Sequence, residues 1–266
     1  MRVWVVRTGA LGDFVATLPV LDALRARADE LVVVAPRRYA ALFRGADQWI
    51  DSDGTGALAM HAGRLPLDDV DVAVAWTSGV ADALRRCGVC RVLEGAPRPP
   101  AGVAIHDHLW APLLEGFGPR TAEPVVRPEP KAVDAIAARL GGLRPVVIAP
   151  GSGGKSKRWP LQRWQDVATH VGRPVLWVGG PVEAGEAGWG EPAWHDLDLS
   201  GLTALAILCH TWLGPDSGPS HLAAAAGARV GVLFTGVTDP RNWAPPGARI
   251  FDGGTSAAAL AAWVRL

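Results

Sequence analysis

Three short segments of the sequence combine glycine with charged or hydroxyl side chains in patterns that suit phosphate and proton chemistry. They are Gly9-Ala-Leu-Gly-Asp13, Pro150-Gly-Ser-Gly-Gly-Lys-Ser-Lys-Arg-Trp-Pro160 and Pro215-Asp-Ser-Gly-Pro-Ser-His-Leu222. Glycine lets the backbone turn tightly and approach a ligand closely. Asp, Lys and His side chains can transfer protons or neutralise charge on a reacting group. These segments therefore hold the candidate functional residues.

The first segment presents the carboxylate of Asp13 directly after a short apolar stretch. Gly9 and Gly12 permit a tight turn there, but the central glycine of the G-x-G-x-x-G dinucleotide fingerprint is missing. Asp13 on a fixed turn predicts a general base that removes a proton from an acceptor hydroxyl. The alternative is an aspartate that caps free amides at the start of a helix. The local sequence leaves both interpretations open.

The second segment is a Gly/Ser-rich loop with added positive charge. Its backbone amides and the Ser152 hydroxyl suit an anion, and Lys155, Lys157 and Arg158 contribute cations. The loop is not a P-loop, because it lacks G-x-x-x-x-G-K-[ST]. We expect Ser152, Gly153 and Lys155 to hold a nucleotide diphosphate, with Lys157 neutralising the leaving group. The alternative is a solvated basic turn.

The third segment places an acid and a histidine at the start of a predicted helix. Pro219 suits the first turn of that helix, and its free amides and dipole favour an anion near Ser217 and Gly218. Asp216 is positioned to hold sugar hydroxyls, and His221 to reach a phosphate or sugar oxygen. The alternative is an Asp/Ser cap followed by a packed histidine.

A further acid follows the predicted strand end at Gly179-Gly180-Pro181. A carboxylate at that place can accept both hydroxyls of a ribose, and Glu183 is the candidate. Glu186 is its rival, and an exposed acid at a helix start is the alternative.

The sequence predicts no metal site. His106 and His108 flank Asp107, but alternate residues of a strand point apart and no third ligand is evident. Cys87 and Cys90 form an isolated C-x-x-C without a second pair, so two ordinary thiols are expected.

The elements that must position these segments alternate between strands and helices. Apolar runs predict strands at 3–6, 31–35, 70–75, 146–150, 175–178, 211–213 and 230–234, and helical spacing predicts helices at 109–117, 132–140, 221–226 and 255–264. A helix after Asp13 is expected to take Thr17 as its cap and Pro19 in its first turn, and a short extra turn before Thr17 is an alternative. The pattern restarts after a Pro-rich stretch, which predicts an α/β protein with two Rossmann-like domains facing a central cleft. The expected boundaries are 1–123, a linker at 124–131, and 132–266.

Composition excludes several classes of protein. The 266 residues include 26 Lys and Arg against 26 Asp and Glu, so the net charge is zero and a broad nucleic-acid surface is not expected. Three cysteines cannot build a disulfide framework, which indicates a reducing compartment. No basic-then-apolar leader or long apolar span is evident, so a cytoplasmic protein is expected.

The ordered motifs resemble glycosyltransferase family 9, the bacterial heptosyltransferase family. The resemblance spans almost the whole chain and is carried by GALGD (9–13), ATLPVLDALR (16–25), IHDHLWAPLLEGFG (105–118), PGSGGKSKRWP (150–160), VGGPVEAGE (178–186), DLSG (198–201), GPDSGPSHLAAAAG (214–227) and VLFTGVTDPRNWAP (232–245). Each motif is moderately specific, and the ordered set is highly specific.

This resemblance implies a GT-B fold and an inverting, metal-independent transfer of a sugar, heptose from an ADP-heptose donor, to an acceptor hydroxyl. The first domain would then be the acceptor side, with Asp13 as general base beside Gly9 and Gly12, and the second would bind the nucleotide-sugar, with its nucleobase near 199–202. The donor-binding residues implied are Ser152, Gly153, Lys155, Lys157, Glu183, Asp216, Ser217, Gly218 and His221.

The implied partners are the nucleotide-sugar donor and a glycan or glycolipid acceptor, and the implied process is lipopolysaccharide biosynthesis. Peripheral contact with the inner face of the membrane would follow. No nucleic acid and no added cofactor are expected. The chain is shorter than typical members of the family, which leaves the acceptor open among lipid A sugars, small glycosides and proteins.

Another GT-B enzyme that uses a UDP- or GDP-sugar, as transferase or epimerase, is an alternative function. So is a catalytically degenerate homologue that binds nucleotide or glycan. An NADP-dependent oxidoreductase, with Arg37 and Arg38 on a 2′-phosphate, is a weaker alternative because GALGD lacks the middle glycine.

Overall fold

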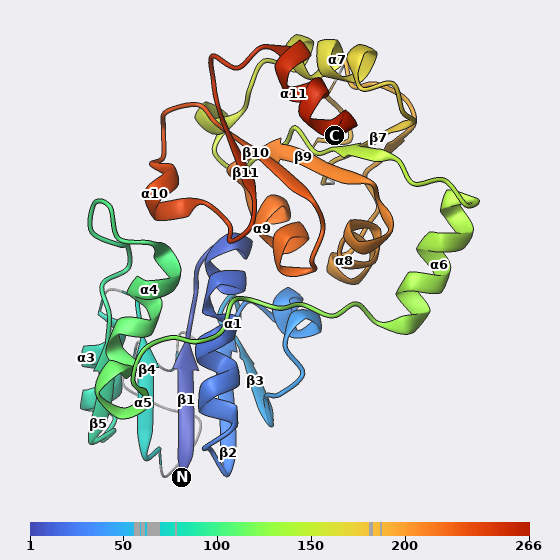
Figure 1. Ribbon diagram of the computed structural model, residues 1–266. Helices are drawn as coiled ribbons and strands as arrows, with labels where there is room; N and C mark the ends of the chain where they lie inside the picture. Colours follow the sequence, from blue (N-terminus) through green and yellow to red (C-terminus); the bar gives the residue numbers. More distant parts are fainter. Residues whose placement is uncertain (56–58, 60–61, 63–69, 78, 181–182, 187) are drawn as a thin grey trace. The chain divides into compact units, whose positions relative to one another are not determined.

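The computed structural model describes residues 1–55, 59, 62, 70–77, 79–180, 183–186 and 188–266. The chain divides into two compact units, Met1–Val125 and Val126–Leu266 (Figure 1). The linker predicted at 124–131 spans this division and overlaps the first turn of helix α6, which begins at Pro130.

The amino-terminal unit is built on a parallel sheet of five strands in the order β3-β2-β1-β4-β5 (Figure 1). The strands are β1 (Arg2–Val6), β2 (Glu30–Ala35), β3 (Gln48–Asp51), β4 (Val72–Ala75) and β5 (Arg91–Glu94). The helical segments are α1 (Leu11–Arg25), η1 (Arg37–Leu42), α3 (Val80–Arg86), α4 (Ile105–Trp110), η2 (Ala111–Leu113) and α5 (Leu114–Phe117). β1 and β2 are almost wholly buried, as their continuous apolar sequences predict for parallel strands.

Helix α1 differs from its prediction at both Thr17 and Pro19. The helix begins at Leu11, so Pro19 lies inside it and Thr17 is not a cap; instead, the Thr17 hydroxyl donates to the carbonyl of Asp13 at 2.8 Å. An internal proline costs a helix about 3 kcal/mol, whereas each large apolar side chain buried from water contributes about 1.5–3 kcal/mol. The buried face from Phe14 to Leu24 therefore outweighs the cost of the proline.

Helix α4 also differs from its prediction, since it begins at Ile105 rather than at Leu109. Ile105 and Leu109 stand four residues apart and are both buried, which is the spacing of one helical face. His106 and His108 consequently lie on a helix, not on the strand assumed from their alternation. The ring of His108 is hydrogen-bonded through Nε2 to the Ala96 carbonyl at 2.7 Å.

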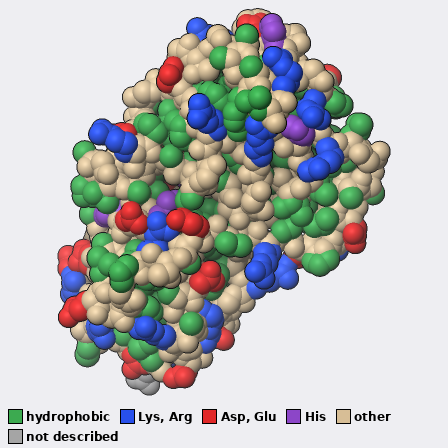
Figure 2. Space-filling view, in the orientation of Figure 1, with side chains coloured by type: hydrophobic (Ala, Val, Ile, Leu, Met, Phe, Trp, Pro, Cys, Tyr) green, Lys and Arg blue, Asp and Glu red, His purple; other side chains and the backbone are tan. Residues whose placement is uncertain are grey.

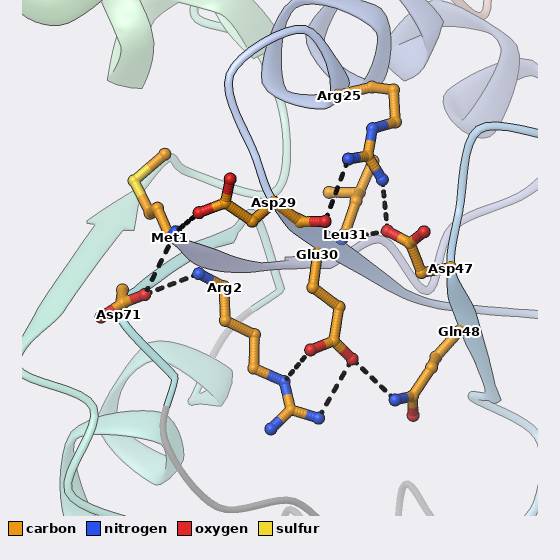
Figure 3. Close-up of polar contacts among 9 residues, drawn as sticks. All are labelled: Met1, Arg2, Arg25, Asp29, Glu30, Leu31, Asp47, Gln48 and Asp71. Atoms are coloured by element: carbon orange, nitrogen blue, oxygen red, sulfur yellow. Dashed lines mark hydrogen bonds and ion pairs between the residues drawn. The ribbon is translucent and has the colours of Figure 1, made fainter.

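Charged side chains connect the amino ends of β1, β2 and β3 (Figure 3). Glu30 contacts the Arg2 guanidinium at 3.0 Å and accepts from the Gln48 amide at 2.7 Å. Asp47, which also pairs with Arg25, accepts from the backbone amide of Leu31 at 2.7 Å. These contacts secure the amino edge of the sheet, while Gly9 and Asp13 follow β1 at its carboxyl end.

The carboxy-terminal unit is built on a parallel sheet of six strands in the order β11-β10-β9-β6-β7-β8 (Figure 1). The strands are β6 (Val146–Ile148), β7 (Val175–Val178), β8 (Ala193–Trp194), β9 (Thr211–Pro215), β10 (Val230–Phe234) and β11 (Arg249–Asp252). The helical segments are α6 (Pro130–Leu140), η3 (Lys155–Lys157), α7 (Leu161–His170), α8 (Leu199–Leu208), α9 (Gly218–Ala225), α10 (Pro240–Trp243) and α11 (Ala257–Arg265). This strand order is that of a Rossmann sheet.

The topology of the second sheet predicts where a ligand binds. From β6 the chain continues to β7 and β8 on one side, and from β9 to β10 and β11 on the other. Ligands of open α/β sheets bind outside the carboxyl ends of the strands at such a reversal of strand order. The candidate segments follow β6, β7 and β9, which are adjacent strands at this position.

The molecular surface carries both signs of charge. On the face shown in Figure 2, both Lys or Arg and Asp or Glu side chains are present, in keeping with 26 residues of each sign in the sequence. Within the described part of the chain, no helix has the length and apolar character needed to span a membrane.

Candidate functional site

Asp13 occupies the first turn of α1, immediately beyond the carboxyl end of β1. Its Oδ1 pairs with the Arg7 guanidinium at 3.0 Å, and its Oδ2 accepts the backbone N–H of Ala10 at 3.0 Å. A Cβ on Gly9 would lie 2.7 Å from Asp13 Oδ2, so glycine allows this close approach. The contact with Ala10 satisfies a free amide at the helix start, and the role of general base stays a prediction.

Arg7 belongs to the site, although it was not predicted from the sequence. Its side chain is only 4% exposed, and burial lowers the pKa of the guanidinium while the negative charge of Asp13 opposes that shift. A buried cation needs a counter-charge, because desolvation of an unpaired ion is costly. An arginine directly after the apolar run of β1 was the available sequence signal. The Arg7 guanidinium fixes one oxygen of Asp13.

The second unit contains a pocket of about 170 Å³ at the carboxyl ends of β6, β7 and β9. One wall is polar and includes Ser152, Glu183 and Ser217, whereas Leu197 and Leu202 contribute apolar surface. The complete lining is Ala149, Gly151, Ser152, Gly153, Val178, Gly179, Gly180, Glu183, Leu197, Leu202, Ser217, Gly218 and Pro219. The pocket therefore lies at the position that the strand order indicates.

Asp216 is the centre of a polar cluster after β9. Its Oδ2 accepts from Lys157 Nζ at 2.8 Å and from the Thr238 hydroxyl at 2.7 Å, and its Oδ1 lies 3.5 Å from His221 Nε2. Burial raises the pKa of Asp216, but hydrogen bonds from His221, Lys157 and Thr238 outweigh burial and lower the pKa to about 2. The cluster therefore holds a buried carboxylate in its ionised form.

The start of α9 is arranged as the sequence predicts. Gly218 begins the helix after Ser217, and both line the pocket. The first N–H groups of a helix have no acceptor within the helix and favour an anion. The Ser217 hydroxyl lies 3.3 Å from that of Ser220, which donates to the carbonyl of Pro215 at 2.8 Å.

Glu183 lies at the pocket wall and is held from two sides. Its Oε1 pairs with the Arg158 guanidinium at 3.0 Å, and its Oε2 accepts the backbone N–H of Gly180 at 2.8 Å. Arg158 also pairs with Glu186 at 2.8 Å. Within the 178–186 motif, Pro181 and Val182 lie outside the described residues.

Most of the predicted donor residues come together, and Lys155 does not join them. Ser152, Gly153 and Glu183 line the pocket with the start of α9, and Lys157 and His221 each contact Asp216 beside it. Lys155 is exposed at the start of η3, where its charge acts on Glu186. Asp13, Gly9 and Gly12 belong to the other unit.

Thr238 also belongs to the site and was not predicted from the sequence. It lies in the loop after β10 and donates to Asp216, and the quoted VLFTGVTDPRNWAP motif contains it without indicating this contact. Within the described residues, no group of three or more His, Cys, Asp and Glu side chains is placed to hold a metal ion.

A comparison with protein families matches the carboxy-terminal motifs, from 150–160 to 232–245. Residues 127–251 match the family model of glycosyltransferase family 9 (heptosyltransferase). No curated protein sequence matches the chain significantly.

Solved structures share the fold at low sequence identity. A glycosyl transferase family 9 protein from Veillonella parvula has a TM-score of 0.78 and 17% identity, over 94% of this chain and 85% of its own. E. coli ADP-heptose LPS heptosyltransferase II has a TM-score of 0.79 and 15% identity, over 98% and 97%. E. coli heptosyltransferase WaaC, solved with ADP-2-deoxy-2-fluoro heptose, has a TM-score of 0.67 and 15% identity, over 99% of each chain.

Two units built on parallel sheets, together with solved glycosyltransferases of similar fold, confirm the predicted α/β, GT-B fold class. Within that class, residues 127–251 match the model of glycosyltransferase family 9 (heptosyltransferase), so the chain is similar to that family. The resemblance drawn from the sequence motifs is thereby confirmed as well.

Proposed function

We propose that the protein transfers a sugar, with inversion, from an ADP-linked heptose donor to the hydroxyl of a glycan or glycolipid acceptor, without a metal ion. The observation that carries this proposal is the Lys157–Asp216–His221 cluster beside the pocket at the start of α9. Cations and helix amides at one edge of a pocket suit a departing diphosphate.

The donor side of the proposal uses the second unit. The diphosphate accepts hydrogen bonds from the free backbone amides at Ser217 and Gly218. Lys157 neutralises the charge that develops on the diphosphate as it leaves the sugar. The ribose hydroxyls donate to Glu183, which lines the same pocket. The nucleobase packs on the apolar surface of Leu197 and Leu202.

The acceptor side of the proposal uses Asp13. The carboxylate removes the proton of the attacking hydroxyl, and general-base assistance of this kind contributes about 10²–10⁴-fold in rate. Support comes from the position of Asp13 at the carboxyl end of β1 and from its pairing with the buried Arg7, which keeps one oxygen fixed. Contact with the inner face of a membrane follows if the acceptor is a glycolipid.

A binding and hydrolysis panel tests the proposal. The protein is titrated with ADP, UDP and GDP, and the release of nucleoside diphosphate from matching sugar donors is measured. ADP is expected to bind most tightly, and ADP-heptose to be turned over fastest. Tighter binding of UDP or GDP would identify the donor as a UDP- or GDP-sugar instead. Absence of binding by all three nucleotides overturns the donor site.

A further inference from the structure

The guanidinium of Arg158 joins two walls of the nucleotide pocket. Its Nη2 contacts Glu183 at 3.0 Å, its Nη1 contacts Glu186 at 2.8 Å, and its Nε donates to the Ser152 carbonyl at 3.0 Å. Ser152 belongs to the loop after β6, and the two glutamates follow β7. A planar guanidinium holds three acceptors in one fixed plane, whereas the three donors of an ammonium group rotate and are not coplanar.

Glu183 is the partner through which Arg158 affects the pocket. The Glu183 side chain is 12% exposed and lines the pocket, whereas that of Glu186 is 41% exposed. A Cβ on Gly151 would lie 2.6 Å from Glu183 Oε1, so the loop after β6 packs directly on this carboxylate. Arg158 and the Gly180 amide each donate to one of its oxygens. A carboxylate has about four acceptor positions, so both oxygens keep capacity for a ligand hydroxyl.

We propose that Arg158 is a positioning residue for nucleotide recognition, which holds the Glu183 carboxylate at the pocket wall so that this acid receives the ribose hydroxyls of a nucleoside diphosphate. The proposal rests on the proposed donor site. Without Arg158, the largely buried Glu183 loses its only charged partner among the described residues and turns toward water. Recognition of the ribose would fail, while the phosphate contacts at Lys157 and α9 would persist.

The test compares the dissociation constants of ADP and 2′-deoxy-ADP by calorimetry. The wild type is expected to prefer ADP by about tenfold or more, because the deoxynucleotide leaves an acceptor of Glu183 unpaired. Arg158→Gln and Glu183→Gln should each reduce the preference to about twofold or less, and the double variant should lose no more. Arg158→Lys, which keeps the charge without the planar fork, should give an intermediate preference.

Arg163→Gln is the matched control. Arg163 lies on α7 and donates to the Gly253 carbonyl at 2.8 Å, away from Glu183, so its loss should leave the ribose preference unchanged. A purely structural role for Arg158 would weaken both nucleotides equally and preserve their ratio. Circular dichroism and melting curves establish whether each variant is folded. If Arg158→Gln is not folded, the ribose preference of Arg158→Lys decides the question.

Each outcome bears on one proposal or the other. A folded Arg158 variant that keeps the wild-type ratio overturns the positioning role and leaves the proposed function intact. A wild type that binds ADP without ribose preference removes Glu183 from ribose recognition, and the role of Arg158 with it. A wild type that binds none of ADP, UDP and GDP overturns the proposed donor site itself.

Discussion

Lys157 Nζ lies 2.8 Å from Asp216 Oδ2, although 59 positions of sequence separate the two residues. The pair brings the loop after β6 to the carboxyl end of β9, the neighbouring strand. The Asp216 side chain is 4% exposed and that of Lys157 is 29% exposed. The Asp216 carboxylate therefore holds the Lys157 ammonium group at the pocket edge, where this group has donors left for a diphosphate.

Replacing Lys157 by alanine should weaken ADP binding. The ammonium offers a charge-assisted hydrogen bond, and loss of such a bond costs about 1.5–3 kcal/mol, or at least tenfold in the dissociation constant. Calorimetric titration with ADP measures the change. Lys155→Ala is the comparison, because Lys155 is exposed and an exposed charge near a phosphate should alter affinity by about threefold or less. Unchanged affinity in Lys157→Ala would count against the phosphate clamp.

Replacing Asp216 by asparagine should change how stability depends on pH. The pKa of Asp216 is lowered to about 2 from its ordinary value of 3.8. A depressed carboxyl pKa contributes stability above the ordinary value and loses that contribution as the pH falls toward the folded value. The shift corresponds to about 2 kcal/mol at neutral pH.

Urea unfolding of the wild type and of Asp216→Asn, from pH 7 to pH 2, measures this contribution. The difference in unfolding free energy between the two proteins should be largest above about pH 4 and shrink by about 2 kcal/mol at the acid end. Asp134→Asn is the control, since Asp134 is exposed on α6. A difference that stays constant with pH would show that the carboxylate is not held in its ionised form by this cluster.

Replacing Asp13 by asparagine should lower turnover strongly without changing the affinity for ADP. Asparagine is nearly isosteric but cannot accept a proton from the acceptor, so turnover should fall by at least ~10²-fold. The measurement is release of nucleoside diphosphate from the donor in the presence of an acceptor, together with ADP affinity, which should not change. Asp22→Asn, at an exposed position of the same helix, should leave both values unchanged. Full turnover in Asp13→Asn would remove Asp13 from the role of base.

Strands in the middle of each sheet were the most predictable part of the fold. The apolar runs predicted strands at 175–178 and 230–234, and β7 and β10 have those bounds. Buried parallel strands have continuous apolar sequences, which local patterning detects. β3 (Gln48–Asp51) and β5 (Arg91–Glu94) were not predicted, because these edge strands are short and only half-buried.

Pairings between segments were the least predictable part of the site. Local sequence marked Asp216 and Lys157 as candidate residues, but not that they would be each other's partners. It also gave no indication that Thr238 donates to Asp216 or that Arg158 holds Glu183. Such contacts depend on which strands are neighbours, and strand order is a property of the whole chain.

Replacing Gly9 by alanine should disturb Asp13 selectively. An added Cβ would lie 2.7 Å from both Cβ and Oδ2 of Asp13, closer than such atoms can approach, so the carboxylate must leave its place beside Arg7. Since Asp13 belongs to the first unit, turnover should fall by about tenfold or more while ADP affinity stays at the wild-type value. Gly116→Ala is the matched control in the same unit, because its Cβ would meet no described atom within 4 Å. Equal turnover in the two variants would mean that the position of Asp13 beside Arg7 is not required for the reaction.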